Sequence, residues 1–227
     1  MGRLVPGAES HTHWLRRAFG ADPVATWTNS EADVVVRCVC RGCNSEWMND
    51  LDQAAEPIVN EMARGVNRVR VVDAALPLFA TWAVKMALVM ECALRPTVIA
   101  PEVRHGFYRD RTPPPGFTVW VATMEGYEEE TRTTPITLVS APEVGGVEQA
   151  YLATFRMLHL VVQVLAPLHS NVRPEHSPDA QNVVQQAWPR EEPLEWPLFP
   201  RERWLLTEED YEALVHSFRT NEVIVEN

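Results

Sequence analysis

We predict an α+β fold for this 227-residue chain, built from a central buried helix and a mostly antiparallel β-layer. The first half of the sequence shows helical spacing of apolar residues, most clearly over residues 44–63 and 73–94. From residue 117 onward, segments rich in β-branched residues alternate with turn-forming residues, which is typical of strands. Hydrophobic residues make up 46% of the chain, so it can bury a core and is not expected to be disordered.

The first 40 residues are predicted to form one short helix and one β segment. The helix is expected over residues 8–19, because its apolar residues are followed by a stop at Gly20. The β segment is expected over residues 27–40, with the valine run at 34–36 as its centre.

A long amphipathic helix is predicted next. From Trp47 its apolar residues recur at i, i+4, i+7, i+8 and i+11, the spacing of one helix face. Asn44 or Ser45 is expected to cap its start, and Gly65 is expected to end it. Pro57 is expected to bend its middle.

The helix expected over residues 73–94 is apolar around most of its circumference, so we place it at the centre of the fold. It contains Lys85 and Glu91, whereas a membrane-spanning helix needs about 20 nearly uncharged residues. We therefore expect a buried core helix and no membrane partner.

The remainder is expected to be mainly β. An arginine-containing loop is predicted over residues 105–116, an irregular proline-rich wrap over 167–200, and a final helix over 208–219. We expect two regions, 1–66 and 67–227, that form one compact unit. The predicted strands span residues 117–124, 134–140, 151–158 and 160–165.

Charge is distributed unevenly along the chain. The net charge is −11, yet residues 1–120 contain thirteen acidic and thirteen basic residues. The N-terminal half can therefore approach nucleic-acid phosphates. The acidic, β-rich C-terminal half would repel them and is the expected face for a protein partner.

The sequence favours a cytoplasmic bacterial or phage protein. Its N-terminus has no apolar stretch of signal-peptide length, and its four cysteines, three of them within six residues, do not resemble a disulfide framework. Nineteen of its twenty basic residues are arginine, which is typical of a GC-rich genome.

The strongest local motif is Cys40-x-x-Cys43, followed directly by Asn44. Two thiolates at this spacing can bind one face of a tetrahedral Zn²⁺ at about 2.3 Å, with His13, His11 or Cys38 as further ligands. The alternatives are a metal-free turn with buried thiols, or Cys–His catalysis by Cys43 with one of the histidines. His11 and His13 can also be ordinary surface residues.

The segment from Val39 to Leu51 resembles the C-terminal half of the HNH endonuclease motif. It is closer still to an HNH-related family of bacteria and phages with the hallmark C-x-x-C-N-x-x-W-M-x-x-L. Further likeness lies at 82–87, 113–116, 119–122 and 196–197. The resemblance implies a treble-clef-like ββα unit at the N-terminus.

The resemblance also implies site residues. His11 would be the general base, with His13 close behind, and Asn44 would take the place of the last residue of the triad beside a catalytic Mg²⁺ or Mn²⁺. Asn29 is a candidate for the middle Asn. The arginines that flank the motif and could contact DNA are Arg16, Arg17, Arg37 and Arg41.

Two departures from the family concern the same region. The family has a C-x-x-C before the His, and none precedes His11 here; the acid–His-to-Trp spacing also differs by about one residue. This pattern suggests a degenerate member, or a sequence with a truncated start. The leading expectation is metal-dependent DNA hydrolysis, and the alternative is a non-catalytic module, such as a phage factor that binds a host protein.

Overall fold

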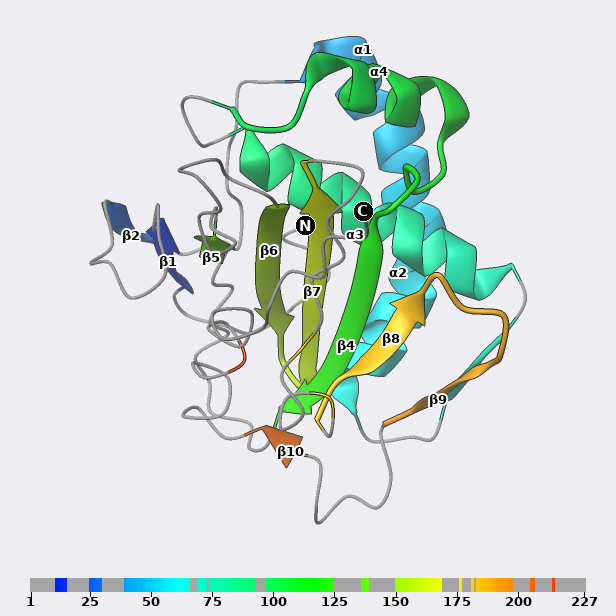
Figure 1. Ribbon diagram of the computed structural model, residues 1–227. Coiled ribbons are helices and arrows are strands. Elements are labelled where there is room, and N and C mark those ends of the chain that lie inside the picture. Colours follow the sequence, from blue (N-terminus) through cyan, green and yellow to red (C-terminus); the bar gives the residue numbers. More distant parts are fainter. Residues whose placement is uncertain are drawn as a thin grey trace, which may run out of the picture.

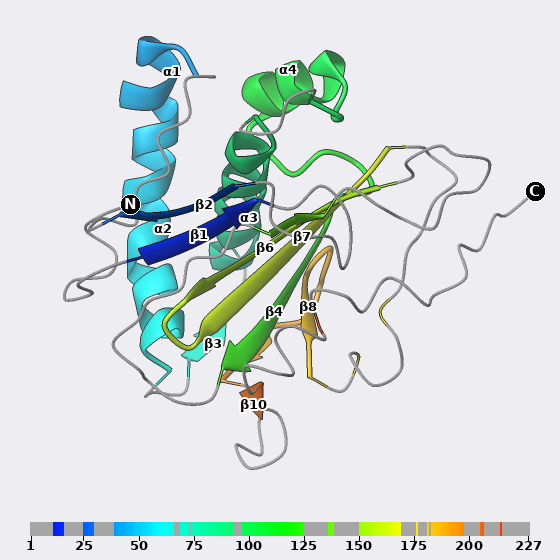
Figure 2. The same ribbon diagram turned by 90° about the vertical axis from the view of Figure 1, so that its left-hand side faces the viewer.

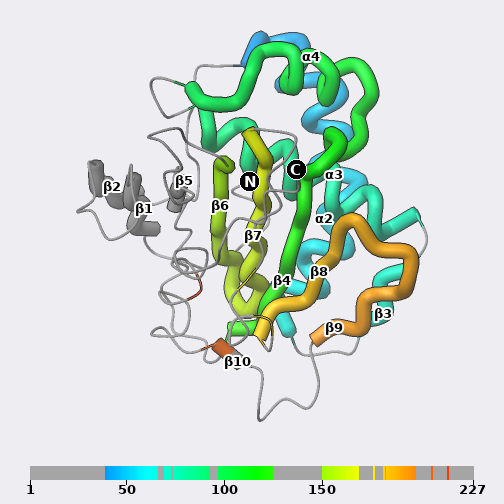
Figure 3. The backbone as a smooth tube through the Cα atoms, in the orientation of Figure 1, coloured from blue at the N-terminus to red at the C-terminus, as the bar shows by residue number. Residues whose placement is uncertain are grey.

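The computed structural model describes residues 11–15, 25–29, 39–65, 69–72, 74–92, 97–124, 136–138, 150–168, 183–197 and 205–206, together with His176, Gln181 and Leu214. Figure 3 traces the course of the backbone and labels its helices and strands. Within this part the fold is α+β, as predicted from the sequence. Helices cover one face of the main sheet (Figures 1 and 2). None of the helices in the described ranges is long and apolar enough to cross a membrane.

The described part of the chain begins with an antiparallel strand pair, where the sequence analysis predicted a helix over residues 8–19. Strands β1 (His11–Leu15) and β2 (Ala25–Asn29) pair antiparallel, with His11 opposite Asn29 and His13 opposite Trp27. The prediction was wrong because both segments are rich in threonine and tryptophan, which favour strands once a partner strand is present. The valine run at 34–36 lies outside the described residues.

The helix predicted from residue 44 is observed in two pieces, α1 (Arg41–Ser45) and α2 (Trp47–Arg64). Neither Asn44 nor Ser45 is a cap. Cys40 caps α1, and Glu46 interrupts the helix with φ −107° and ψ −110°. Gly65 ends α2 as predicted, in the left-handed conformation with φ +63°, and Pro57 lies inside the helix.

Helix α3 (Ala75–Glu91) is the central buried helix predicted from the sequence. It lies between α2 and the sheet and is buried on almost every side (Figure 2). Its two charged residues each have a partner: Lys85 forms an ion pair with Asp52 of α2, and Glu91 forms one with Arg104. The described apolar core spans α2, α3 and the sheet, so residues on both sides of position 66 share it.

Helix α4 (Pro101–Asp110) replaces the first half of the loop predicted over residues 105–116. Pro101 occupies the first turn, where a backbone N–H has no partner within the helix and its absence removes no hydrogen bond. Arg109 lies in the last turn, where a positive charge interacts favourably with the helix dipole. Phe107 is buried, which anchors the helix. Arg111 ends it with φ +52°.

The main sheet has the order β10-β4-β7-β6-β5, and β8 also pairs with β4. All of these pairings are antiparallel except that of β10 with β4. The four strands predicted from the sequence are confirmed as β4, β5, β6 and β7. Their bounds and that of β10 are Thr118–Met124, Ile136–Leu138, Ala150–Met157, Leu160–Pro167 and Leu205–Leu206.

The stretch 167–200, predicted to be irregular, contains two further strands. β8 (Gln185–Trp188) joins the main sheet, and β9 (Leu194–Trp196) pairs with β3 (Val69–Val71). Trp196 is fully buried and its indole Nε1 donates a hydrogen bond to the Met62 carbonyl at 2.9 Å. Of the helix predicted over 208–219, Leu214 alone lies in the described part, and it is buried.

The two faces of the sheet belong to separate apolar clusters, because side chains alternate along each strand. Val119 and Val121 of β4 face the helices, whereas Trp120 and Met124 belong to the opposite face. On that second face the ring of His176 packs edge-on against Trp120, with ring centroids 4.6 Å apart. This face therefore carries a buried, titratable residue inside an apolar cluster.

Candidate functional site

The Cys40-x-x-Cys43 turn is held by its own backbone. Cys40 has an extended conformation, with φ −66° and ψ 153°, and its carbonyl accepts the Asn44 N–H at 3.0 Å. Its Sγ accepts the Cys43 N–H at 3.1 Å. Cys40 is exposed and Cys43 is half-buried, so the turn presents one accessible and one partly covered sulfur.

The environment shifts the pKa values of the two thiols in opposite directions. The pKa of Cys40 is lowered, chiefly by a hydrogen bond from the Cys43 thiol and then by the Cys43 backbone N–H. The pKa of Cys43 is raised, chiefly because its thiol donates to Cys40. Cys40 is therefore the sulfur that the site favours as a thiolate.

Trp47 supplies a further donor to this turn. Its buried indole Nε1 makes no hydrogen bond that meets ordinary geometry within the described part of the chain, yet it is near enough to the Cys43 thiol to favour the thiolate. The backbone N–H of Cys43, which donates to the Cys40 sulfur, is an outer partner of the kind that orients a metal ligand. The turn thus fits one half of a tetrahedral zinc site.

The other half of such a site is not defined by the described residues. The side chains of His11 and His13, and Cys38 as a whole, lie outside them. Among the residues that are described, no three His, Cys, Asp or Glu side chains converge as metal ligands. Cys40 and Cys43 are therefore the two candidate ligands whose geometry is known.

Helix α4 lies against Trp47 at the start of α2, which the sequence did not indicate. Trp47 contacts Phe107 and Tyr108 edge-on, with centroid separations of 5.7 and 5.9 Å. The guanidinium carbon of Arg111 lies 5.8 Å from the centre of the Trp47 ring. Helices α1 and α4 consequently share one end of the molecule in both views (Figures 1 and 2).

This end carries an exposed aromatic ring among charged side chains. Tyr108 is 51% exposed and is the one large hydrophobic residue of the described part that is exposed. Arg41 is exposed on α1, while Arg109 forms a two-bond ion pair with Asp110 at 2.7 and 2.8 Å. The pKa of Arg109 is raised and that of Asp110 lowered, each first by this hydrogen bond.

The predicted site residues divide into two sets. Cys40, Arg41, Cys43 and Asn44 lie together at α1, where Asn44 is exposed, and His11 lies opposite Asn29 in the strand pair. Sequence reasoning missed the contribution of α4 to this surface. The spacing of Val103 and Phe107, after a proline at the first helical position, was the available signal for that helix. Three predicted DNA-contacting residues lie outside the described part of the chain: Arg16, Arg17 and Arg37.

Comparison with models of known protein families, with curated proteins and with solved structures finds no match to this chain. Any function must therefore be argued from the residues and their geometry.

Proposed function

We propose that this chain is an HNH-like nucleic-acid-processing protein that hydrolyses DNA phosphodiesters in a bacterial or phage-infected cytoplasm. One observation carries the proposal: the antiparallel strand pair sets His11 opposite Asn29 and precedes the helix that bears Asn44. This order, two strands followed by a helix, is the arrangement that the sequence resemblance implies. Asn29 thereby gains the support that its spacing in the sequence did not supply.

In this proposal the residues have separate roles. His11 would accept the proton of the attacking water, which a neutral imidazole can do near pH 7. Asn44, which is exposed in the last turn of α1, would hold a divalent ion together with the histidines. Mg²⁺ or Mn²⁺, when bound, would supply stabilisation of negative charge on the phosphate.

Cys40 and Cys43 would have a structural role, as two of the ligands of a zinc ion, with His13 as a third. The support is the geometry of the turn, in which the two sulfurs lie three residues apart and the Cys40 sulfur accepts the Cys43 N–H at 3.1 Å. Zinc would then fix the turn from which Asn44 projects.

Arg41 and Arg111 are the cations of this surface that would meet the DNA backbone. Arg41 is exposed at the turn, and Arg111 is held over the Trp47 ring by a cation–π contact. Alanine at either position should weaken binding to all DNA sequences alike and reduce the salt dependence of binding by about one phosphate contact.

The proposal is tested by nicking of supercoiled plasmid in the presence of Mg²⁺ or Mn²⁺. Nicking should be lost in His11→Ala and Asn44→Ala, and kept in the matched controls His105→Ala and Asn49→Ala, which are exposed and have no role in the proposed site. A wild-type protein that never cuts at any concentration of either ion contradicts the proposal. That result would favour the non-catalytic protein-binding module instead.

Zinc is tested separately by metal analysis of the purified protein. The proposal expects one zinc per chain, lost in Cys40→Ser and in Cys43→Ser and retained in Cys92→Ser. Zinc content that is zero in the wild type, or that is unchanged in the first two variants, contradicts the structural role of the turn.

A further inference from the structure

The turn that carries Cys40 and Cys43 has the geometry of a disulfide-forming pair. Cys40 is the N-cap of α1 and Cys43 is the third residue of that helix. Residues three apart in a helical turn have Cα atoms about 5 Å apart, which lies inside the range of roughly 4.4–6.8 Å that disulfides span. The Cys40 Sγ already accepts the Cys43 N–H at 3.1 Å, so it lies over the turn that contains Cys43.

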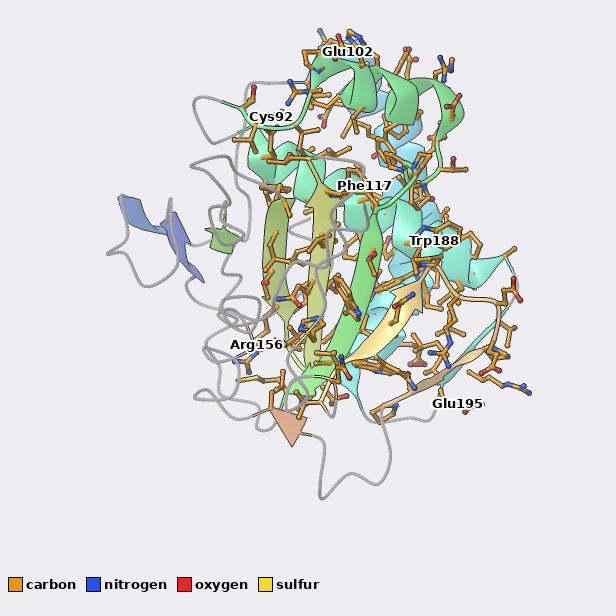
Figure 4. All side chains as sticks on the ribbon, viewed as in Figure 1. Cys92, Glu102, Phe117, Arg156, Trp188 and Glu195 are labelled. Carbon is orange, nitrogen blue, oxygen red and sulfur yellow. The ribbon has the colours of Figure 1, made fainter. Side chains whose placement is uncertain are left out.

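The two sulfurs also differ in accessibility in the way that an exchange reaction requires. Cys40 is exposed and can be reached by a disulfide in solution, whereas Cys43 is half-buried beside Trp47. The remaining described cysteine, Cys92, follows α3 as its C-cap residue (Figure 4). Cys92 is half-buried like Cys43, and no other cysteine lies three or four residues from it, so it offers an internal comparison.

We infer that Cys40 and Cys43 form a redox-active dithiol that exchanges with low-molecular-weight disulfides. The Cys40 thiolate attacks one sulfur of the small disulfide and forms a mixed disulfide, and the first small thiolate leaves. The Cys43 thiolate then attacks the Cys40 sulfur, the protein disulfide forms, and the second small thiolate leaves. Two protein thiols are oxidised and one small disulfide is reduced to two thiols, so electrons and atoms balance.

This activity goes beyond the proposed nuclease and does not depend on it. It uses the same two sulfurs as the proposed zinc site, and a sulfur in a disulfide cannot ligate zinc. Oxidation would therefore release any zinc held at the turn, and bound zinc would slow oxidation. A chain without zinc keeps the exchange reaction.

The experiment treats the full-length protein, with and without prior exposure to EDTA, with oxidised glutathione, and then digests it with trypsin under non-reducing conditions. Cleavage after Arg37, Arg41 and Arg64 places Cys38 and Cys40 in one peptide and Cys43 in the next. A Cys40–Cys43 disulfide joins these two peptides, and tandem mass spectrometry shows which cysteine of the first peptide is linked. We expect this link as the main product, reversed by reduced glutathione.

The variants resolve the two steps. In Cys43→Ser, the mixed disulfide with glutathione should accumulate on Cys40, because the resolving thiol is missing. In Cys40→Ser the link should be lost, and in Cys92→Ser and Cys38→Ser it should form as in the wild type. A link through Cys38 instead of Cys40, or an adduct on Cys92 that forms faster than any change at Cys40, overturns the inference. The EDTA arm tests the zinc site separately. Faster oxidation after EDTA supports a zinc ion at the turn, whereas equal rates contradict the zinc site and not the exchange reaction.

Discussion

Oε2 of Glu91, at the end of α3, accepts a hydrogen bond from Nη1 of Arg104 in α4 at 2.7 Å. The other oxygen of this fully buried carboxylate accepts the backbone N–H groups of Val98 and Ile99 at 2.6 and 3.0 Å. The Glu91 carboxylate thus accepts hydrogen bonds both from the backbone just before α4 and from Arg104, the first cation in that helix. We conclude that Glu91 fixes the position of α4, and through it the contacts of Tyr108 and Arg111 with Trp47.

Glu91→Gln should destabilise the fold by about 2–4 kcal/mol, because it removes the negative partner of a buried ion pair and points an amide N–H₂ at a donor. Urea unfolding followed by tryptophan fluorescence measures the loss. Glu102→Gln is the control, since Glu102 lies on the outer side of α4 (Figure 4) and should change stability by less than about 0.5 kcal/mol. Equal effects of the two substitutions would show that Glu91 has no special role.

The ion pair between Lys85 and Asp52 should respond asymmetrically to mutation. Lys85 is the single lysine of the chain and is buried; burial lowers its pKa, and Asp52 opposes that change. The Asp52 side chain is 36% exposed, so water can solvate it without a partner. Asp52→Asn should therefore cost about 2–4 kcal/mol, whereas Lys85→Met should leave stability within about 1 kcal/mol of the wild type or raise it. Both values come from chemical denaturation at pH 7, and a larger loss in Lys85→Met would contradict the argument.

Sequence periodicity predicted the elements whose apolar surface is decided locally. The apolar circumference of α3, the valine-rich strand β7 and the stop at Gly65 all follow from short stretches of sequence. The errors arose in segments whose conformation depends on contacts with a distant part of the chain. The composition of β1 fits a helix or a strand, and pairing with β2 decides for the strand. Helix α4 is short and weakly apolar, so its position depends on contacts with Glu91 and Trp47.

The candidate site was predictable in part for the same reason. Cys40, Cys43 and Asn44 are neighbours in the chain, so their spacing in the sequence already fixes their spacing in space. Tyr108 and Arg111 contact Trp47 only through the packing of α4, which no local pattern encodes. The opposition of His11 and Asn29 likewise depends on the register of two strands.

Two glycines should give opposite results when changed to alanine. Gly65 has φ +63°, and a Cβ there would lie 2.9 Å from Cβ of His159, so Gly65→Ala should destabilise by about 1–3 kcal/mol. Gly106 lies inside α4 with no atom within 4 Å of an added Cβ, so Gly106→Ala should stabilise by roughly 0.5–1 kcal/mol. Thermal unfolding of both variants tests the pair, and a shift in melting temperature of the same sign in each would contradict the assigned backbone roles.

His176 should make the fold sensitive to mild acid. Burial holds its pKa at about 3, far below the ordinary value of 6.5. Above pH 6.5 the imidazole is neutral in the folded and the unfolded chain. Below pH 6.5 the His176 imidazole becomes protonated in the unfolded chain, whereas in the folded chain it stays neutral until the pH approaches 3. The stability present above pH 6.5 is therefore lost as the pH falls, by about 2 kcal/mol between pH 6.5 and 5.

The measurement is the free energy of unfolding in urea across pH 5–7, for the wild type and for His176→Phe. Phenylalanine keeps a ring against Trp120 but cannot take up a proton, so the variant should lose about 2 kcal/mol less than the wild type over this range. The other six histidines are the same in both proteins, so their effects cancel in the comparison. His105→Gln, at an exposed position, should keep the wild-type pH dependence. If His176→Phe and the wild type showed the same slope, the imidazole would not be the group that limits stability in mild acid.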